Sequence, residues 1–328
     1  MDCRALGRTD LQVSACGFGC GMVGGLLVRG EYPAMRHAVA RAIESGINYF
    51  DTAPLYGDGQ SEVNLGAVLR ELRARIAVGT KVRLAVADLD RIEAAIIESA
   101  EASLRRLGRD AVDLFQLHNL FTDRRRPDQA SLTPDDLPVV LRAFETLHRQ
   151  GKIRFWGVTA LGDTEALHRV VDLGGFHTIQ TVYNLLNPSG GRPVRPDFPY
   201  QDYRRLIDRA AANRIGVIAI RVLAGGALSG TTDRHPIATP GVAPLATGRD
   251  YAEDAARAHA FDFLVADGTV GSLVEAAIRF ALSKAEISTA MVGTSSLDQL
   301  DQAVVAANRG PLPAPALERL ARIHPGPA

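Results

Sequence analysis

The stretch Ile47-Asn-Tyr-Phe-Asp-Thr-Ala-Pro-Leu-Tyr56 decides the fold and the chemistry of this chain. Its first four residues form a short strand-like run, and Pro54 marks a turn after it. Asp51 closes the run, and Tyr56 follows five positions later on the turn. The stretch therefore predicts two proton-handling side chains, a carboxylate and a phenol, at the rim of one pocket.

Similar apolar runs recur along the whole chain, and longer amphipathic segments separate them. Strands are predicted at residues 13–18, 47–51, 76–80, 112–117, 153–159, 178–182, 216–220 and 289–292. Helices are predicted at residues 34–44, 61–72, 91–106, 137–150, 164–172 and 203–214. Apolar strands joined by helical crossovers indicate a parallel sheet that is covered by helices. Eight such units indicate an α/β fold, a closed (β/α)8 TIM barrel; a doubly wound open sheet is the alternative.

Further elements are predicted at both ends of this single domain, which spans residues 1–328. Residues 3–14 alternate weakly and turn between Gly7 and Asp10, as in a β-hairpin that caps the barrel floor. Residues 230–250 are rich in Pro, Gly and Thr, and an extra helix is predicted at residues 251–265 before the C-terminal helices. Long loops of this kind, including the Pro-rich residues 185–200, tend to be functional lids or disordered.

Composition narrows the class of protein. The 328 residues are 46% hydrophobic, and Lys plus Arg balances Asp plus Glu at 37 each, so no net charge favours nucleic acid or anionic lipid. Cys3, Cys16 and Cys20 form no disulfide framework and no recognisable metal site, which fits a reducing compartment. No signal-peptide or membrane-spanning apolar stretch occurs, so we expect a cytoplasmic protein that binds neither membrane nor nucleic acid.

Two other predicted strands end in residues that complete the site. Lys81 follows the run at residues 76–80, and His118 follows the run at residues 112–117. The carboxyl ends of parallel barrel strands share one face, so both side chains should converge there with Asp51 and Tyr56. An ammonium beside a phenol favours the phenolate, and a carboxylate would keep that ammonium charged. With His118 as a donor to a substrate oxygen, the group suits protonation of a developing alkoxide.

Each of these residues also has a simpler interpretation. Asp51 could cap the next helical turn, Lys81 could lie on the barrel surface, and His118 could be a hydrogen-bonded core histidine. Four such residues at successive strand ends favour the catalytic interpretation.

These motifs resemble those of the aldo-keto reductases. Gly46-Ile-Asn-Tyr-Phe-Asp-Thr-Ala-Pro-Leu-Tyr-Gly57 is similar to the family's signature, and Ser103-Leu-Arg-Arg-Leu-Gly-Arg-Asp-Ala-Val-Asp-Leu-Phe-Gln-Leu-His118 to its second. Gly151-Lys-Ile-Arg-Phe-Trp-Gly-Val158 and Gln180 continue the match in the same order. The resemblance implies a barrel oxidoreductase that uses NADPH/NADP+, or less often NADH. It also implies a catalytic tetrad of Asp51, Tyr56, Lys81 and His118, with Tyr56 as the general acid in reduction and no metal.

The same resemblance places the cofactor. Cys20 and Gly21 would approach the nicotinamide, although these glycine-rich residues could equally form a tight turn. Gln180 would hold the carboxamide, and a hydroxyl-rich segment after the last strand would bind the adenosine phosphate. Ser295 and Ser296 could instead simply cap a helix. The full set of expected cofactor-binding residues is Cys20, Gly21, Asp51, Thr159, Gln180, Ile220, Arg221, Leu223, Gly225, Gly293, Thr294, Ser295, Gln299 and Gln302.

The chain departs from the family pattern at several of these positions. Thr159-Ala160 stands where the family often has Ser-Asn, and Ile220 where an aromatic ring often stacks on the nicotinamide. Arg221 replaces a common serine and could reach the pyrophosphate. No Lys or Arg occurs between Gly293 and Asn308, so recognition of a 2′-phosphate would need Arg221, Arg234 or Arg249.

The resemblance leaves three functions open: a carbonyl reductase, a dehydrogenase that oxidises a sugar lactol or an alcohol, and a cofactor-binding regulatory subunit like the potassium-channel β subunits. The intact tetrad favours an enzyme with a small carbonyl or alcohol substrate. Reaction direction, substrate and oligomeric state do not follow from the sequence. Residues with side chains suited to lining the substrate pocket are Asn119, Phe121, Tyr183, Phe198 and Tyr200.

Overall fold

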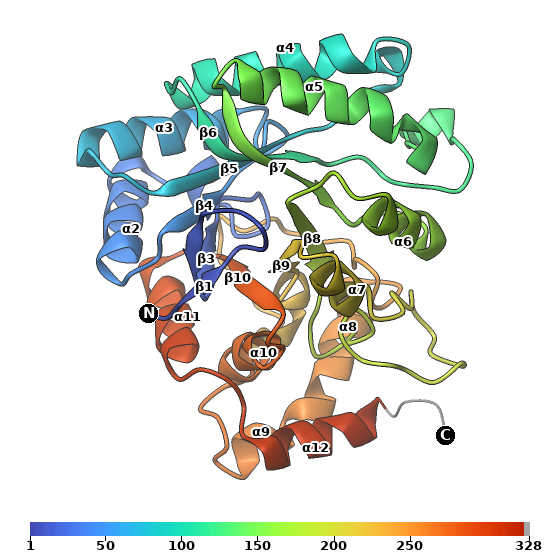
Figure 1. Cartoon of the computed structure of the whole chain (residues 1–328). Coiled ribbons are helices and arrows are strands. Elements are labelled where there is room, and N and C mark those ends of the chain that lie inside the picture. The colour runs from blue at the N-terminus through green and yellow to red at the C-terminus, as the bar shows by residue number, and fades with distance from the viewer. Residues whose placement is uncertain (325–328) are drawn as a thin grey trace.

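The barrel is closed by eight parallel strands, which the computed structural model shows together with the rest of residues 1–324 (Figure 1). They are β3 (Cys16–Gly19), β4 (Tyr49–Asp51), β5 (Ala77–Val82), β6 (Val112–Leu117), β7 (Ile153–Thr159), β8 (Thr178–Val182), β9 (Gly216–Ile220) and β10 (Ile287–Gly293). Chain order runs around the barrel from β3 to β9, and β10 pairs with both β9 and β3. The predicted TIM barrel is therefore confirmed, and the open sheet is excluded.

The N-terminal hairpin is present, but the predicted strand at residues 13–18 is two separate strands. β1 (Cys3–Ala5) pairs antiparallel with β2 (Gln12–Ser14), and β3 begins only at Cys16. The chain bends at Ser14, whose hydroxyl donates to the Cys16 carbonyl at 2.7 Å and whose amide donates to Asn48 Oδ1 at 2.7 Å. These local bonds separate the hairpin from the barrel, which the continuous apolar pattern did not reveal.

Helices cover the outside of the barrel (Figure 1). The helices that follow successive barrel strands are α2 (Tyr32–Glu44), α3 (Gln60–Leu72), α4 (Ile92–Leu107), α5 (Leu137–Arg149), α6 (Thr164–Leu173), α7 (Leu206–Ala212), α10 (Leu273–Leu282) and α11 (Leu297–Asn308). Additional helices are α1 (Leu26–Arg29), α8 (Tyr251–Ala258), α9 (Phe263–Ala266) and α12 (Ala314–Ile323). None of these described helices has the length and apolarity needed to cross a membrane.

Two helical regions differ from the pattern-based prediction. The helix predicted at residues 251–265 is broken by a 3-10 turn at His259–Phe261, so that α8 and α9 are separate. The helix α10 was not recognised, because eight of its ten residues are buried and it therefore lacks a polar face.

The core has two parts. Most of it lies between the strands and the helices, where Phe18, Phe50, Phe115 and Phe144 are fully buried. A smaller part fills the floor of the barrel and consists of Leu6, Leu11, Val13, Tyr49, Leu114, Ile218 and Met291. The hairpin supplies the first three of these residues, so it closes the floor. The site can open only at the other end, where the strands terminate.

Candidate active site

The four predicted catalytic residues project from three adjacent strands. Asp51 is the last residue of β4, Lys81 lies near the end of β5, and His118 directly follows β6. In a strand, alternate residues face the same side, and the register pairs Asp51 with Gly79 and Lys81 with Gln116. These pairings bring the side chains to neighbouring positions inside the upper end of the barrel. Tyr56 approaches them from the turn after β4.

Lys81 connects Asp51 to Tyr56. Its Nζ forms an ion pair with Asp51 Oδ1, donates to the Thr52 carbonyl at 2.8 Å and contacts Tyr56 Oη at 3.3 Å. Lys81 is 1% exposed and Asp51 6%, so the pair is buried, whereas Tyr56 is half-buried. The simpler interpretations of Asp51 as a helix cap and of Lys81 as a surface residue do not fit this placement.

The second oxygen of Asp51 accepts hydrogen bonds from three neutral donors. They are Gln180 Nε2 at 2.8 Å, Tyr49 Oη at 3.1 Å and Gln116 Nε2 at 3.1 Å. Both carboxylate oxygens are therefore occupied, as a buried charge requires. Sequence analysis had not identified Tyr49 and Gln116. Their spacing could have identified them. Tyr49 lies two residues before Asp51 and Gln116 two residues before His118, so each turns a polar group to the barrel interior.

The electrostatics of the site favour a charged Lys81 and a neutral His118. Burial lowers the pKa of Lys81, but the adjacent Asp51 carboxylate and Tyr56 outweigh this effect, and the pKa lies above its usual value. Burial, together with the positive charges of Lys81 and Arg83, lowers the pKa of His118 to about 3. His118 Nδ1 lies 2.9 Å from Thr159 Oγ1, which orients the ring.

Such an arrangement can move a proton. The phenol oxygen of Tyr56 lies 3.3 Å from the charged ammonium of Lys81, which can stabilise negative charge developing there. It can therefore release a proton to a developing alkoxide or accept one from an alcohol. His118, held neutral by its surroundings, can orient a substrate oxygen without adding charge.

Several of the expected cofactor-binding residues surround this group. The amide of Cys20 donates to the Asp51 carbonyl at 2.9 Å, and a Cβ atom at Gly21 would lie 3.7 Å from the Tyr56 ring. Thr159 Oγ1 donates to Gln180 Oε1 at 3.4 Å, so these two residues are linked beside Asp51. Burial and the neighbouring Asp51 raise the pKa of Cys20, which rules it out as a reactive thiolate at neutral pH.

The segment after β10 lies against the loop after β3. A Cβ atom at Gly24 would stand 2.6 Å from the Thr294 carbonyl oxygen, and Ser295 Oγ donates to the Gly24 carbonyl at 2.6 Å. Thr294 Oγ1 is buried and has no partner among residues 1–324. Gly293 is exposed, and a Cβ atom there would meet no atom closer than 3.4 Å. An open glycine, an unpartnered hydroxyl and a helix N-terminus fit a phosphate group.

The N-cap interpretation of this segment also holds in part. Ser296 caps α11 by accepting from the Gln299 amide, and Gln299 Oε1 in turn accepts from the Ser295 amide at 2.8 Å. Gln299 therefore covers one of the donors that a phosphate would use. Gln302 is exposed on α11, one turn further along.

The three arginines considered for binding a 2′-phosphate all follow β9, and they differ in their contacts. Arg221 directly follows Ile220 with a left-handed backbone (φ 56°), and its Nη1 donates to the Ala243 carbonyl at 3.3 Å. Arg234 donates to the carbonyls of Thr239 and Gly225 at 2.7 and 2.9 Å. Arg249 is 88% exposed and pairs with Glu253. Leu223 and Gly225 lie in the turn between Arg221 and Arg234, where a Cβ atom at Gly225 would come within 3.1 Å of Arg221 Nη1.

Residues 230–250 cross over to the loop after β3. The Thr239 hydroxyl donates to the Met22 carbonyl at 2.7 Å, and its amide to the Val23 carbonyl at 3.1 Å. Arg29 donates to the Ile237 carbonyl at 2.7 Å. This segment is thus held against the loop after β3, two strands away around the barrel, which suits a lid.

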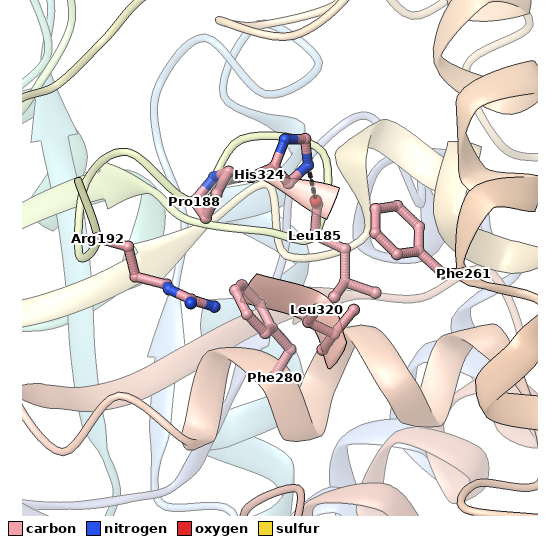
Figure 2. Close-up of a pocket in the computed structure, with 7 residues that line it drawn as sticks. All are labelled: Leu185, Pro188, Arg192, Phe261, Phe280, Leu320 and His324. Atoms are coloured by element: carbon pink, nitrogen blue, oxygen red, sulfur yellow. Dashed lines mark hydrogen bonds between the residues drawn. The ribbon is translucent and has the colours of Figure 1, made fainter. Parts of the chain in front are cut away.

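The residues suggested for the substrate pocket are mostly engaged in loop packing. Asn119 hydrogen-bonds to the backbone of Leu84 and Ala130, and Phe121 is fully buried. The ring of Tyr183 stacks on that of Phe280, with 5.0 Å between the ring centroids. Figure 2 shows how the loop at residues 185–200 is anchored: side chains from this loop pack with those of α10, α12 and their surroundings, and His324 Nε2 contacts the Leu185 carbonyl at 3.0 Å. Phe198 and Tyr200 are partly exposed and lie edge to face.

Three exposed apolar side chains at the rim were not anticipated. Met22, Leu55 and Val86 are 41%, 40% and 51% exposed and follow the adjacent strands β3, β4 and β5. Leu55 immediately precedes Tyr56. All three lie in segments that follow these strands, at the end of the barrel where the tetrad lies.

Comparisons with known proteins agree with this geometry. The sequence profile described as the Aldo/keto reductase family matches residues 16–324. L-galactose dehydrogenase of Arabidopsis thaliana is 29% identical over 309 residues, which is 93% of this chain and 88% of that protein. A putative voltage-gated potassium channel subunit beta of Schizosaccharomyces pombe is 33% identical over 204 residues, 58% of this chain and about half (52%) of that protein. The holo form of an aldo-keto reductase from Bacillus halodurans superposes with a TM-score of 0.73 at 27% identity, covering 99% of this chain and 96% of that one.

Proposed function

The chain belongs to the aldo/keto reductase family, and on that premise we propose that it transfers hydride reversibly between NADPH and the carbonyl carbon of a small aldehyde or ketone. Family membership supports an oxidoreductase with a nicotinamide cofactor; the preference for NADPH and the role of each side chain belong to the proposal. The observation that carries it is the contact of one buried ammonium, Lys81, with both Asp51 and Tyr56.

In the proposed reaction the bound cofactor supplies or takes up the hydride, and the residues of this chain handle the proton. Tyr56 Oη gives its proton to the substrate oxygen as negative charge develops there. Lys81 stabilises the phenolate that remains, and Asp51 keeps Lys81 charged and directed at Tyr56. His118, held by Thr159, orients the substrate oxygen. Oxidation of an alcohol uses the same groups in reverse.

The cofactor is proposed to lie across the carboxyl ends of the strands. Its nicotinamide would lie near Asp51 and Gln180, with Cys20, Gly21, Thr159 and Ile220 around it. Arg221, Leu223 and Gly225 would contact the pyrophosphate, and the segment from Gly293 to Ser295, together with Gln299 and Gln302, would bind the adenosine end. The unpartnered hydroxyl of Thr294 and the open position of Gly293 support the adenosine end of this placement. A holo structure with adenine at the N-terminal hairpin would contradict it.

Two other functions have specific support. The name of the Arabidopsis relative, L-galactose dehydrogenase, favours the oxidative direction with a sugar substrate. The similarity to a putative potassium channel subunit favours a cofactor-binding regulatory role over part of the chain. The chain has all four tetrad residues, and they lie in contact with one another or on adjacent strands. This arrangement supports turnover instead.

The apolar side chains of Met22, Leu55 and Val86 suit a substrate with an apolar portion.

One experiment separates these functions. Purified protein is mixed with NADPH or NADH and a panel of aldehydes, ketones, pyridoxal and sugars, and with the oxidised cofactors and the corresponding alcohols or sugars. Steady cofactor oxidation or reduction indicates an enzyme, and the better substrate class gives the direction. Saturable cofactor binding without turnover across the panel would support the regulatory role and contradict the proposed one.

A further inference from the structure

Two polar side chains support Asp51 from below, inside the barrel. Tyr49, on the same strand, and Gln116, on β6, each donate a hydrogen bond of 3.1 Å to Asp51 Oδ2. Both residues are 0% exposed. Tyr49 belongs to the packed floor cluster, and Gln116 pairs in register with Lys81. Their place beneath Asp51 puts them on the side away from the strand ends where a substrate enters.

The position of the Tyr49 hydroxyl is fixed by its surroundings. The ring is packed in the floor cluster with residues such as Leu114 and Met291. A Cβ atom at Gly79 would lie 2.4 Å from Tyr49 Oη, so only a glycine at this position of β5 leaves room for the hydroxyl. Burial and the nearby Asp51 charge raise the pKa of Tyr49 well above its usual value. Tyr49 therefore remains a neutral donor to the carboxylate throughout the accessible pH range.

Gln116 is held in one orientation by the same carboxylate. Because an ionised carboxylate only accepts hydrogen bonds, the amide must turn its Nε2 towards Asp51. Its Oε1 is buried and has no partner among residues 1–324. Buried polar atoms without a partner are uncommon, and an apolar side chain would fill this position without that penalty. The amide is thus better explained by its bond to Asp51 than by packing.

We propose that Tyr49 and Gln116 are positioning residues that act through Asp51 on Lys81, an inference that rests on the proposed function. Their two hydrogen bonds help to fix the plane of the Asp51 carboxylate. Oδ1 is thereby held towards Lys81, and the ammonium stays between Asp51 and Tyr56 Oη. Without them Oδ2 keeps only its bond from Gln180, so the carboxylate is held less firmly and the ammonium is less well placed to stabilise the phenolate during proton transfer.

The variants Tyr49→Phe and Gln116→Leu remove these donors while keeping most of the side-chain volume. We expect each to lower kcat roughly tenfold, the effect of losing one hydrogen bond to a charged group, and to leave substrate KM and cofactor Kd within about twofold. The matched control is Thr178→Val. Thr178 faces the barrel interior two residues before Gln180, and its buried hydroxyl has no partner among the described residues. Its removal should leave kcat unchanged.

A double-mutant cycle with Lys81→Met distinguishes positioning from a general packing effect. Single-turnover rates with excess enzyme are measured for each substitution in the wild type and in Lys81→Met. If Tyr49 and Gln116 act through Asp51 and Lys81, their substitution should cause little further loss once Lys81 is gone. The same fold-loss in both backgrounds, or an equal loss in Thr178→Val, would overturn the inference.

The outcomes separate this inference from the proposed function. A wild-type protein without turnover on any substrate contradicts the proposed function, and the inference with it. Turnover by the wild type and impairment by Lys81→Met, with full activity of Tyr49→Phe and Gln116→Leu, contradicts the inference alone. Circular dichroism establishes that each variant is folded. If Tyr49→Phe is not, Gln116→Leu decides the test, because it keeps the Tyr49 ring in the floor cluster.

Discussion

The ammonium of Lys81 lies 3.3 Å from the phenol oxygen of Tyr56, inside a barrel where Lys81 is 1% exposed. A charge at this depth is tolerated because Asp51 pairs with it and because Asp51 is itself held by further donors. The same burial strengthens the influence of the charge on Tyr56, since little water screens it. The barrel thus maintains one permanent positive charge beside one phenol.

Replacing Lys81 by methionine should move the pH–rate profile of alcohol oxidation to higher pH. In the proposed mechanism, oxidation uses the phenolate of Tyr56 as base, and the loss of the neighbouring ammonium makes a phenolate less favourable. Initial rates with an alcohol and the oxidised cofactor between pH 6 and 11 measure the shift. Lys152→Met is the matched control, because Lys152 pairs with Glu101 at the surface away from the tetrad. Superimposable profiles at similar rates would show that Lys81 does not influence Tyr56.

His118 should make the stability of the protein depend on pH below neutrality. Its pKa in the folded state is about 3, so the folded protein keeps the ring neutral while the unfolded chain takes up a proton near pH 6.5. Stability is therefore fully present above pH 6.5 and is lost progressively as the pH falls towards 3. In His118→Gln this loss is absent.

Urea unfolding of wild type and His118→Gln between pH 7.5 and pH 4.5 measures this difference. The unfolding free energy of the wild type should fall relative to that of the variant by about 2 kcal/mol as the pH decreases over this range. This figure is reduced for the partial exposure of the ring. His177, whose pKa is lowered to about 4 chiefly by burial, is present in both proteins and cancels. A gap that stays constant over this range would contradict a neutral, buried His118.

Arginine residues outside residues 293–308 should provide the preference for NADPH over NADH. A guanidinium gives bidentate, charge-assisted contacts to a phosphate that hydroxyl groups do not match. Fluorescence titration of both cofactors into the wild type and into the three variants Arg221→Ala, Arg234→Ala and Arg249→Ala tests this. Loss of the responsible arginine should weaken the binding of NADPH by roughly 1.5–3 kcal/mol and that of NADH by less.

Three results would count against this account of cofactor choice. Equal affinity of the wild type for both cofactors would remove the preference itself. Unchanged discrimination in all three variants would remove its proposed origin. If Arg221→Ala binds both cofactors more weakly by the same factor, Arg221 contacts the pyrophosphate that the two cofactors share.

The sequence predicted the barrel because the regular alternation of apolar runs and amphipathic helices is a local signal. It failed where local signals were absent or ambiguous. The run at residues 13–18 looked continuous because Ala15 and Cys16 are apolar, although hydrogen bonds of Ser14 and Asn48 divide it. The helix at Leu273–Leu282 was missed because burial removes the polar face on which the pattern depends.

The convergence of Asp51, Lys81 and His118 could be predicted because each lies at the end of a strand, and a barrel brings strand ends together. Tyr49 was missed although it lies two residues before Asp51 on the same strand. Gln116 was missed because it reaches Asp51 from another strand, and register is not visible in a single sequence. Residues that line a pocket could not be separated from those that pack a loop for a similar reason. Loops pack by long-range contacts, as Tyr183 does on Phe280 and as Asn119 does on Leu84 and Ala130.

The most direct test of the central claim is the turnover of Tyr56→Phe with a carbonyl substrate accepted by the wild type. The substitution removes only the phenol oxygen that contacts Lys81. Steady-state NADPH oxidation should fall by roughly two orders of magnitude or more, as expected for the loss of a positioned general acid, while the NADPH Kd changes by less than about twofold. Turnover by the folded variant close to that of the wild type would remove Tyr56 from the mechanism and contradict the account.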